Sequence, residues 1–271
     1  MAHRHGHHSG GVLQLDTLAT HSGLRGVSPG LKTAFSVIVL LLCVSAADAV
    51  VGASVAVSMT ALIWRLGNVS LKQIFRLLRI PLLFLIVSCG VILLELCGEP
   101  LGIWHLKLGS FWLCITSDSV SRTVTLFFQA MGAVTCVYFL STTTPMPQLI
   151  EVLRRCHLPE LVIELMFLIY RYLFVLLEVQ QQMTVAATAR LGYDGLRRSI
   201  LTAGRVSGSL LASSFRRSSL CFDAMESRGY DGKLAFLTHI PRLSRTHFLA
   251  AAAYVLALLV LIFARKGLLC P

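Results

Sequence analysis

The sequence lacks the motifs of the common catalytic and nucleotide-binding sites. It has no G-x-x-x-x-G-K-[ST] loop, no H-E-x-x-H pair and no G-x-S-x-G nucleophile. Its eight cysteines are scattered without a C-x-x-C pair, so we interpret them as small buried hydrophobic residues rather than as a disulfide framework. The first thirty residues lack an apolar core with a small-residue cleavage site, so we expect no cleavable signal peptide. We therefore expect neither an enzyme nor a cofactor.

Charged residues are also scarce, at 14% of the chain, whereas 55% of the residues are hydrophobic. The mean hydropathy of +0.74 is too high for a soluble globular protein. The net charge of +11 could indicate a nucleic-acid partner. However, the basic residues fall between apolar runs, as they do in the cytoplasmic loops of membrane proteins. The composition therefore predicts the lipid bilayer, and no nucleic acid, as the partner of this surface.

The apolar runs predict an all-α polytopic protein with about five transmembrane helices. The run at 33–64 would form a helix of about 48 Å, against a hydrocarbon core of about 30 Å. We therefore expect two short helices there, with Asp48 at the outer turn between them. Further spans are expected at 81–97, where Pro81 begins the helix, and at 121–140 and 247–264. The alternation at 103–109 indicates a small β-hairpin outside the membrane.

The apolar stretch 161–179 is long enough to span, but its charges predict otherwise. Glu164, Arg171 and Glu178 recur every seven residues, which places them in one stripe along a helix. A span here would also export the arginines of the following segment, against the positive-inside rule. We therefore expect a long amphipathic helix at the membrane. The predicted organisation is a cytoplasmic segment at 1–32, four spans at 33–140, a cytoplasmic coupling-helix domain at 141–246, and the last span with the C-terminus at 247–271.

A second long helix is expected at about 196–228, and it carries small residues at four-residue spacing. Gly204, Gly208 and Ala212 would form a flat strip where another helix can cross closely. The alternative is that these are incidental small residues. The N-terminal His3, His5, His7 and His8 could bind a soft divalent metal through their imidazoles, but four histidines on a flexible tail could equally be a tag remnant or a weak metal trap.

Two related motifs are the most informative feature of the chain. Arg190-Leu-Gly-Tyr-Asp-Gly and Arg228-Gly-Tyr-Asp-Gly each close an expected helix, and their arginines are 38 residues apart. An arginine in a last helical turn opposes the helix dipole, and a glycine supplies a left-handed cap, which would explain one such motif. Two copies instead indicate a duplicated partner with two acidic grooves, because a guanidinium binds carboxylates through a planar fork of hydrogen bonds.

These motifs resemble those of the T component of energy-coupling-factor transporters, in particular the cobalt-type CbiQ-like branch. Asp16 with Pro29-Gly-Leu-Lys32 is similar to the family's N-terminal signature, and Tyr170-Arg-Tyr172 is close to the cobalt branch. The resemblance implies that the ATPase-binding residues are Ala189, Arg190, Leu191, Gly192, Ser227, Arg228 and Gly229. Leu191 stands where the family consensus has a small residue, and Ser227 stands in place of alanine, although both arginines are kept.

The resemblance also implies a set of partners and a mechanism. Two ABC ATPase subunits would hold the arginines, and their ATP-driven closure would tilt the scaffold and an attached substrate-binding membrane subunit. That S component would be CbiM-like, with or without a small CbiN-like subunit, and the complex would lie in the bacterial inner or plasma membrane. The chain itself would neither hydrolyse ATP nor bind the ion tightly. Nickel or a vitamin remains an alternative cargo to cobalt, and a polytopic membrane enzyme remains an alternative class.

Overall fold

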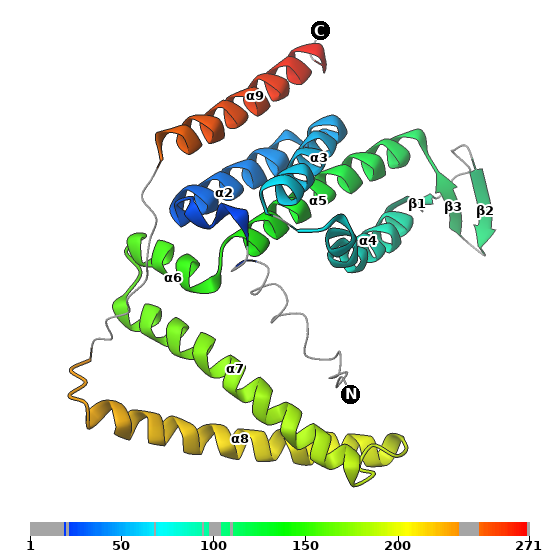
Figure 1. Cartoon of the computed structure of the whole chain (residues 1–271). Helices are drawn as coiled ribbons and strands as arrows, with labels where there is room; N and C mark the ends of the chain where they lie inside the picture. Colours follow the sequence, from blue (N-terminus) through cyan, green and yellow to red (C-terminus); the bar gives the residue numbers. More distant parts are fainter. Residues whose placement is uncertain are drawn as a thin grey trace. The chain divides into compact units, whose positions relative to one another are not determined.

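The computed structural model describes residues 19, 22–67, 69–93, 95–97, 104–108, 111–232 and 244–269, and these form two compact units (Figure 1). One unit contains the helices α6 (Met146–Arg155), α7 (Glu160–Ala189) and α8 (Leu196–Glu226). The other contains the 3-10 helix η1 (Gly23–Gly26), the helices α2 (Pro29–Ala46), α3 (Ala49–Leu66), α4 (Leu71–Leu93), α5 (Ser117–Thr143) and α9 (Arg245–Leu269), and the strands β1 (Glu95–Cys97), β2 (Trp104–Leu108) and β3 (Phe111–Ile115).

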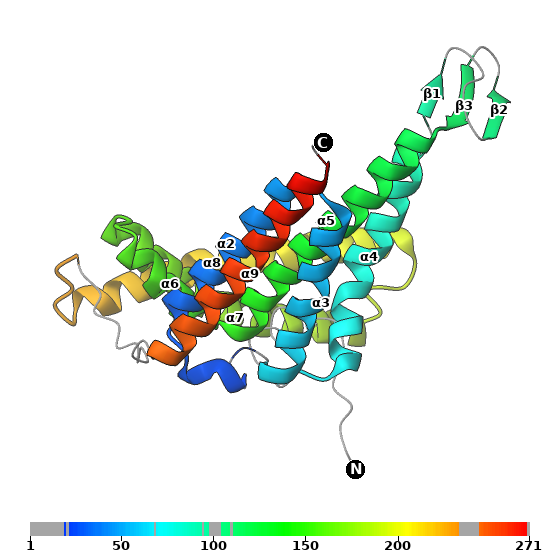
Figure 2. The same cartoon turned by 90° about the horizontal axis from the view of Figure 1, so that it is seen from above.

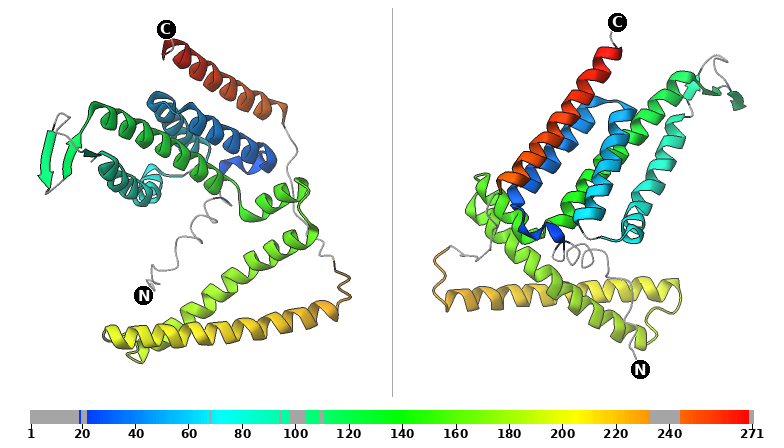
Figure 3. Two further views of the ribbon diagram at one scale, coloured as in Figure 1. Left: turned by 180° about the vertical axis from the view of Figure 1, so that it is seen from behind. Right: turned by 45° about the horizontal axis from the view of Figure 1, so that its top comes forward.

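The second unit is a bundle of membrane-spanning helices. Within the described ranges, five helices are long and apolar enough to cross a bilayer, namely α2, α3, α4, α5 and α9. Figure 2 and Figure 3 show that α9 lies beside α2, that α5 packs along α3 and that α4 lies on the other side of α5. The prediction of an all-α polytopic membrane protein is confirmed, and α7 is not among the candidate spans.

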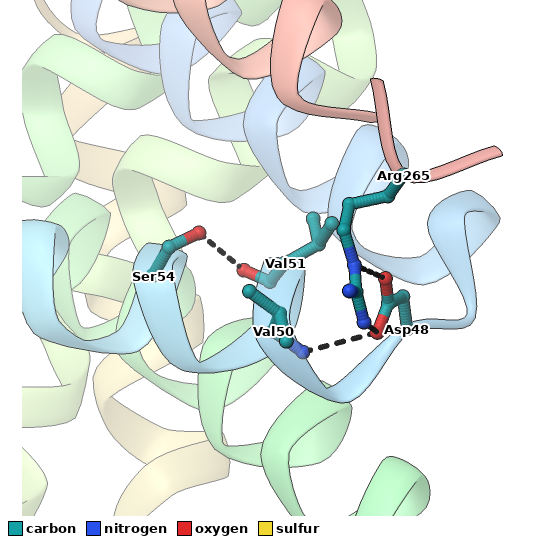
Figure 4. A network of polar contacts seen from close by, with 5 residues as sticks. All are labelled: Asp48, Val50, Val51, Ser54 and Arg265. Atoms are coloured by element: carbon teal, nitrogen blue, oxygen red, sulfur yellow. Dashed lines mark hydrogen bonds and ion pairs between the residues drawn. The ribbon is translucent and has the colours of Figure 1, made fainter. Parts of the chain in front are cut away.

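The first two spans form the predicted hairpin, with Asp48 at the turn between α2 and α3. Ala47 closes α2 in a left-handed conformation, and the Asp48 carboxylate caps α3 by accepting a hydrogen bond from the Val50 N–H, at 3.2 Å. The same carboxylate binds the Arg265 guanidinium near the end of α9, at 2.8 Å from Nε to Oδ2 and 3.3 Å from Nη2 to Oδ1 (Figure 4). The turn of the hairpin is thereby tied to the end of the last span.

A close helix crossing in the bundle joins α3 to α5 at two glycines. A Cβ atom added to Gly52 would lie 2.6 Å from the backbone of Phe128, and one added to Gly132 would lie 2.9 Å from the Gly52 carbonyl oxygen. Neither position has room for a side chain, so these glycines set the distance between the two helices. Sequence analysis missed this crossing, although Gly52 and Ala56 carry the four-residue spacing of small residues that such contacts use.

The third span begins ten residues earlier than predicted, which is a correction to the sequence analysis. Pro81 does not begin a helix but lies inside α4, so the basic residues of the segment 65–79 that follow Leu71 belong to the first turns of the same helix. A proline inside a helix has no N–H for the carbonyl four residues earlier, here that of Leu77. The Tyr138 hydroxyl of α5 donates to this carbonyl at 3.1 Å. A neighbouring helix therefore replaces the missing bond, as membrane helices require.

A small antiparallel sheet connects α4 to α5. The strand order is β1-β3-β2, and the register of β2 with β3 pairs Trp104 with Ile115 and Leu108 with Phe111. The predicted hairpin at 103–109 is thus present as part of a three-stranded sheet. Lipid offers no hydrogen-bond partners for the backbone N–H and C=O groups at the open edges of a sheet. We therefore expect this sheet to lie outside the hydrocarbon core.

The unit formed by α6, α7 and α8 has its own small core. Ile150 of α6 packs with Ile163 and Phe167 near the start of α7. α7 continues to Ala189, ten residues beyond the predicted apolar stretch, and α8 returns beside it. α8 has no buried residue, and large apolar side chains such as Leu196 and Phe215 are exposed on it. This unit therefore presents apolar surface that the described chain does not cover.

Candidate functional site: two arginine-bearing helix caps

The first cap comprises residues 187–192 and ends α7. The Gly192 N–H donates to the Ala187 carbonyl at 2.9 Å, and the Leu191 N–H donates to the Thr188 carbonyl at 3.0 Å. This pair of bonds, six-to-one and five-to-two, defines a Schellman motif. Arg190 follows the last helical residue, and its N–H also bonds to the Ala187 carbonyl, at 3.2 Å. The motif fixes the backbone that carries Arg190.

The second cap comprises residues 225–230 and ends α8 in the same way. The Tyr230 N–H donates to the Met225 carbonyl at 3.1 Å, and the Gly229 N–H donates to the Glu226 carbonyl at 2.9 Å. The Arg228 N–H bonds to the Met225 carbonyl at 3.0 Å. Relative to its arginine, each of the three bonds joins the same positions as in the first cap. Arg190 and Arg228 are therefore structurally equivalent residues.

The residue after each arginine takes the left-handed conformation, but the two caps fill that position differently. In the second cap it is Gly229, with φ of 77°, as the sequence analysis expected. In the first cap it is Leu191, with φ of 56°, and not Gly192, which corrects the expectation that a glycine supplies the turn. Gly192 serves close approach instead, because a Cβ there would lie 2.9 Å from the Ala187 carbonyl oxygen. The first cap therefore carries backbone strain that the second does not.

Both guanidinium groups are available to a partner. Arg190 and Arg228 are exposed, and within the described part of the chain no ion pair includes either of them. Arg198, by comparison, lies 3.8 Å from Asp194 as an exposed pair one helical turn apart. An arginine without an internal carboxylate can use its whole fork of donors for an external one.

Arg228 shares a pocket of about 400 Å³ with two further arginines, Arg171 of α7 and Arg217 of α8. Tyr172 and Cys221 also line this pocket, and the hydrogen bond between them, together with burial, raises the pKa of Tyr172. Three guanidinium groups around one hollow favour a carboxylate or phosphate ligand. Sequence analysis placed Arg171 only in a charged stripe and did not single out Arg217, so it missed this cluster.

Two side-chain hydrogen bonds hold α7 and α8 together near the caps. Thr202 of α8 donates to the Gly192 carbonyl at 2.7 Å, close to the turn between the helices. At the other end, the Tyr230 hydroxyl donates to the buried carboxylate of Glu164 at 2.9 Å, and this bond raises the pKa of Tyr230. The second cap is thus tied to the start of α7, which belongs to the core with α6.

The small-residue strip lies on the open face of α8. At about 100° per residue, Gly204 is about 200° around the helix from Thr202, which faces the α7 turn. A Cβ atom added to Gly204 or Gly208 would meet nothing within 4 Å, and Ala212 is exposed. The predicted crossing at this strip is therefore not formed between α7 and α8, because their contact uses the opposite face.

Metal ligands do not gather in the part of the chain that the structure describes. No group of three or more histidine, cysteine, aspartate or glutamate side chains occurs there. The histidine cluster of residues 3–8 lies outside the described residues, so the structure does not bear on it.

Comparison with known proteins gives consistent matches over most of the chain. Residues 21–240 match the family model of CbiQ, described as cobalt transport protein, and this range includes both caps. The uncharacterized protein MJ1089 of Methanocaldococcus jannaschii is 29% identical over 252 residues, which is 93% of each chain. A putative fused cobalt transport protein CbiMQ of Methanocorpusculum labreanum is 30% identical over 94% of this chain and 42% of its own. The cobalt transport protein CbiQ of Salmonella typhimurium is 28% identical over 61% of this chain and 74% of its own.

Proposed function

Because the chain belongs to the CbiQ family of cobalt transport proteins, we propose that it is the transmembrane scaffold, or T component, of an energy-coupling-factor importer for cobalt. In this role it couples ATP hydrolysis by two partner ATPase subunits to uptake of the ion. The observation that carries the proposal is the structural equivalence of Arg190 and Arg228. Two structurally equivalent arginines on one chain fit two copies of one partner.

Each arginine would bind an acidic groove on one ATPase subunit. The cap holds the backbone of the arginine rigidly, so that little order has to be created on binding. Exposed apolar side chains lie near both arginines: Leu191 directly follows Arg190, and Leu220 lines the pocket of Arg228. Such residues would exclude water around the charge pair, which strengthens a charge-assisted hydrogen bond.

The hairpin of α7 and α8 would transmit the motion of the ATPases. Its two ends are tied by the Thr202 and Tyr230 hydrogen bonds, and its start shares a core with α6. A force on Arg190 or on Arg228 would therefore move the hairpin as one body. In this proposal α6 passes that movement to the membrane helices, because it follows α5 after only two residues.

The membrane helices would hold the substrate-binding subunit. The fused CbiMQ relative joins a CbiM sequence to the region that this chain matches, which supports a CbiM-like S component as the neighbour. A small CbiN-like subunit belongs to the same proposal. We place the complex in the bacterial inner or plasma membrane, with α6, α7 and α8 on the cytoplasmic side, where the ATPases would be.

Co-purification with the ATPases tests the proposal. Arg190→Ala and Arg228→Ala should each weaken assembly, by about 2–5 kcal/mol for a desolvated interfacial arginine, and the double variant should lose more than either. Arg→Lys at either position should rescue only in part, because an ammonium cannot reproduce the planar fork. Arg205→Ala is the matched control, since Arg205 is an exposed arginine of α8 that lines neither cap nor the arginine pocket.

The proposal fails if the double variant still co-purifies with its ATPases and supports normal ion uptake. The arginines would then be helix caps only. The metal content of the purified complex, compared after growth with cobalt and with nickel, identifies the cargo separately.

A further inference from the structure

A pocket at one end of the membrane bundle combines an apolar wall with a buried cation. Its volume is about 230 Å³, and its lining includes Lys32 and Phe35 of α2, Leu66 of α3, Phe139 of α5, and His247 and Ala251 of α9. The volume lies below the roughly 300–1,000 Å³ of sites for compact small molecules. Its wall of aliphatic and aromatic side chains resembles the surroundings of a hydrocarbon chain.

Lys32 is the unusual residue in this wall, because it is a cation and only 3% of the residue is exposed. The ammonium donates to the Leu24 carbonyl at 3.1 Å and to the Thr143 carbonyl at 2.9 Å. An ammonium has three donors, so one remains after these two bonds. The carbonyl of Thr143 belongs to the last turn of α5, where the helix dipole is negative.

The charge of Lys32 has no carboxylate to balance it within the described residues. The pocket lining contains no carboxylate, and its other ionisable residues are His247 and Tyr254. A buried cation without a counter-charge is costly in a protein interior. Carbonyl oxygens lower this cost, but an anion would lower it further.

The pocket lies at the basic end of the bundle. It is lined by residues from the start of α2, the end of α3 and the start of α9, and Arg65 and Arg245 lie within two residues of the lining positions Leu66 and His247. Basic pockets between membrane helices on the cytoplasmic side are places where anionic lipid headgroups bind. The apolar wall, the cation and the position in the bilayer therefore call for the same ligand.

We propose that this pocket binds an anionic phospholipid, with one acyl chain against Phe35, Phe139 and Ala251 and the phosphate beside Lys32 and His247. The lipid would fill the gap between α9 and the helices α2 and α3. Because Lys32 also holds the end of α5, the lipid would stabilise the membrane bundle at the end where α5 leads to α6.

Native mass spectrometry of the full-length chain in mild detergent tests this proposal. The protein is mixed with equal amounts of phosphatidylglycerol and phosphatidylcholine that carry identical acyl chains. We expect about fivefold more bound phosphatidylglycerol, since a basic residue near an anionic lipid contributes attraction of this order. Free glycerol phosphate, which lacks the acyl chain, should not displace the lipid.

Two variants locate the site. Lys32→Gln removes the charge and should reduce the preference to near unity. Since this change also alters the bonds to α5, Ala251→Phe serves as a second variant that keeps Lys32 and fills the apolar wall, and it should remove the bound lipid. Ala252→Phe is the matched control, because Ala252 is the next residue of α9 and is exposed outside the pocket.

Equal binding of the two lipids to the unmodified protein would overturn the proposal, as would full displacement by glycerol phosphate. An unchanged preference in the Ala251→Phe variant would do the same, because the lipid would then bind elsewhere.

Discussion

Tyr138 of α5 supplies the hydrogen bond that Pro81 withholds inside α4. The hydroxyl donates to the carbonyl of Leu77, the residue whose helical partner the proline replaces. In a bilayer no water can take that place. The pair explains how a continuous helix passes through a proline within a membrane span.

A double-mutant cycle measures this relationship. Tyr138→Phe should lower the free energy of unfolding by about 0.6 kcal/mol, and by no more than about 1.7 kcal/mol, the mean and the maximum measured for hydrogen bonds between membrane helices. In a Pro81→Ala background the same change should cost much less, because the backbone N–H that this substitution restores would bond to the Leu77 carbonyl itself. Unfolding of the four purified proteins in lipid–detergent micelles, followed by circular dichroism, gives the coupling. Equal costs of Tyr138→Phe in both backgrounds would show that the hydroxyl does not replace the missing bond.

The ion pair of Asp48 with Arg265 should make the attachment of α9 dependent on pH. The hydrogen bond from Arg265, together with the Val50 N–H bond and the Arg265 charge, lowers the pKa of Asp48 below its ordinary 3.8. A carboxyl with a lowered pKa in the folded state contributes stability above the ordinary pKa, and loses it as the pH falls through the lowered value. Asp48→Asn should therefore lower the melting temperature at neutral pH, and the difference should disappear in acid. A difference that persists at low pH would show that the effect does not come from the charge of Asp48, since asparagine can cap the helix equally well. Arg265→Gln is the partner control.

The strain at Leu191 predicts an unusual stabilising change. Leu191→Gly should raise the stability of the first cap by about 1 kcal/mol, since the left-handed conformation costs a residue with a side chain about 1–2 kcal/mol. Gly229→Ala in the second cap should have the opposite sign and similar size. Hydrogen exchange of the Gly192 and Tyr230 amides reports each cap locally. If Leu191→Gly accelerates exchange at Gly192, the side chain of Leu191 stabilises the cap more than its backbone destabilises it.

Topology can be tested by cysteine labelling in intact cells. In a protein whose native cysteines are replaced, Ser117→Cys at the start of α5 should react with an impermeant maleimide from outside. Arg197→Cys and Arg217→Cys in α8 should react only after the cells are opened, because the many arginines of this helix favour the cytoplasm. Labelling of either α8 position in intact cells would place the α7–α8 hairpin outside and would remove the ATPases as its partners.

Substitutions in the open strip on α8 should impair assembly with a partner without impairing the folding of α8. Gly208→Leu should leave the α7–α8 hairpin intact and stabilise α8 by up to about 1 kcal/mol, since glycine is a poor helix former. We nevertheless expect transport to fall, because a partner helix seated on the strip would be displaced, at about 1–3 kcal/mol for an overfilled contact. Gly208→Ala is the milder control. Unchanged uptake in Gly208→Leu would show that no partner uses the strip.

Much of the membrane bundle could be predicted from the sequence because hydrophobic length and charge report on the bilayer directly. The turn at Asp48 and the five spans follow from these signals. The start of α4 could not be predicted, because local preference forbids a proline in mid-helix and only the contact with Tyr138 permits it. Tertiary contacts of this kind lie beyond any single segment.

The two matching helix ends were also predictable, since their motif is repeated, but the surroundings of their arginines were not. Arg171 and Arg217 join Arg228 only after α7 and α8 have folded back on each other. The direction of the Gly204 strip depended on which face of α8 meets α7, and small-residue spacing alone does not decide this. The left-handed Leu191 was hidden because sequence preference assigns that conformation to the neighbouring glycine.

The length of α8 fixes the distance between the two arginine-bearing caps. Its 31 residues span about 46 Å, and about 36 Å of that length separates the second cap from Thr202, which bonds to the first cap. They also fix the rotational phase of one arginine relative to the other. Inserting one residue would turn Arg228 by about 100° and away from the groove proposed for it, whereas inserting seven would nearly restore the direction and lengthen the helix by about 10 Å. In the proposed complex, α8 would therefore set the spacing and the mutual orientation of the two ATPase subunits, and a change of its length alone would uncouple them.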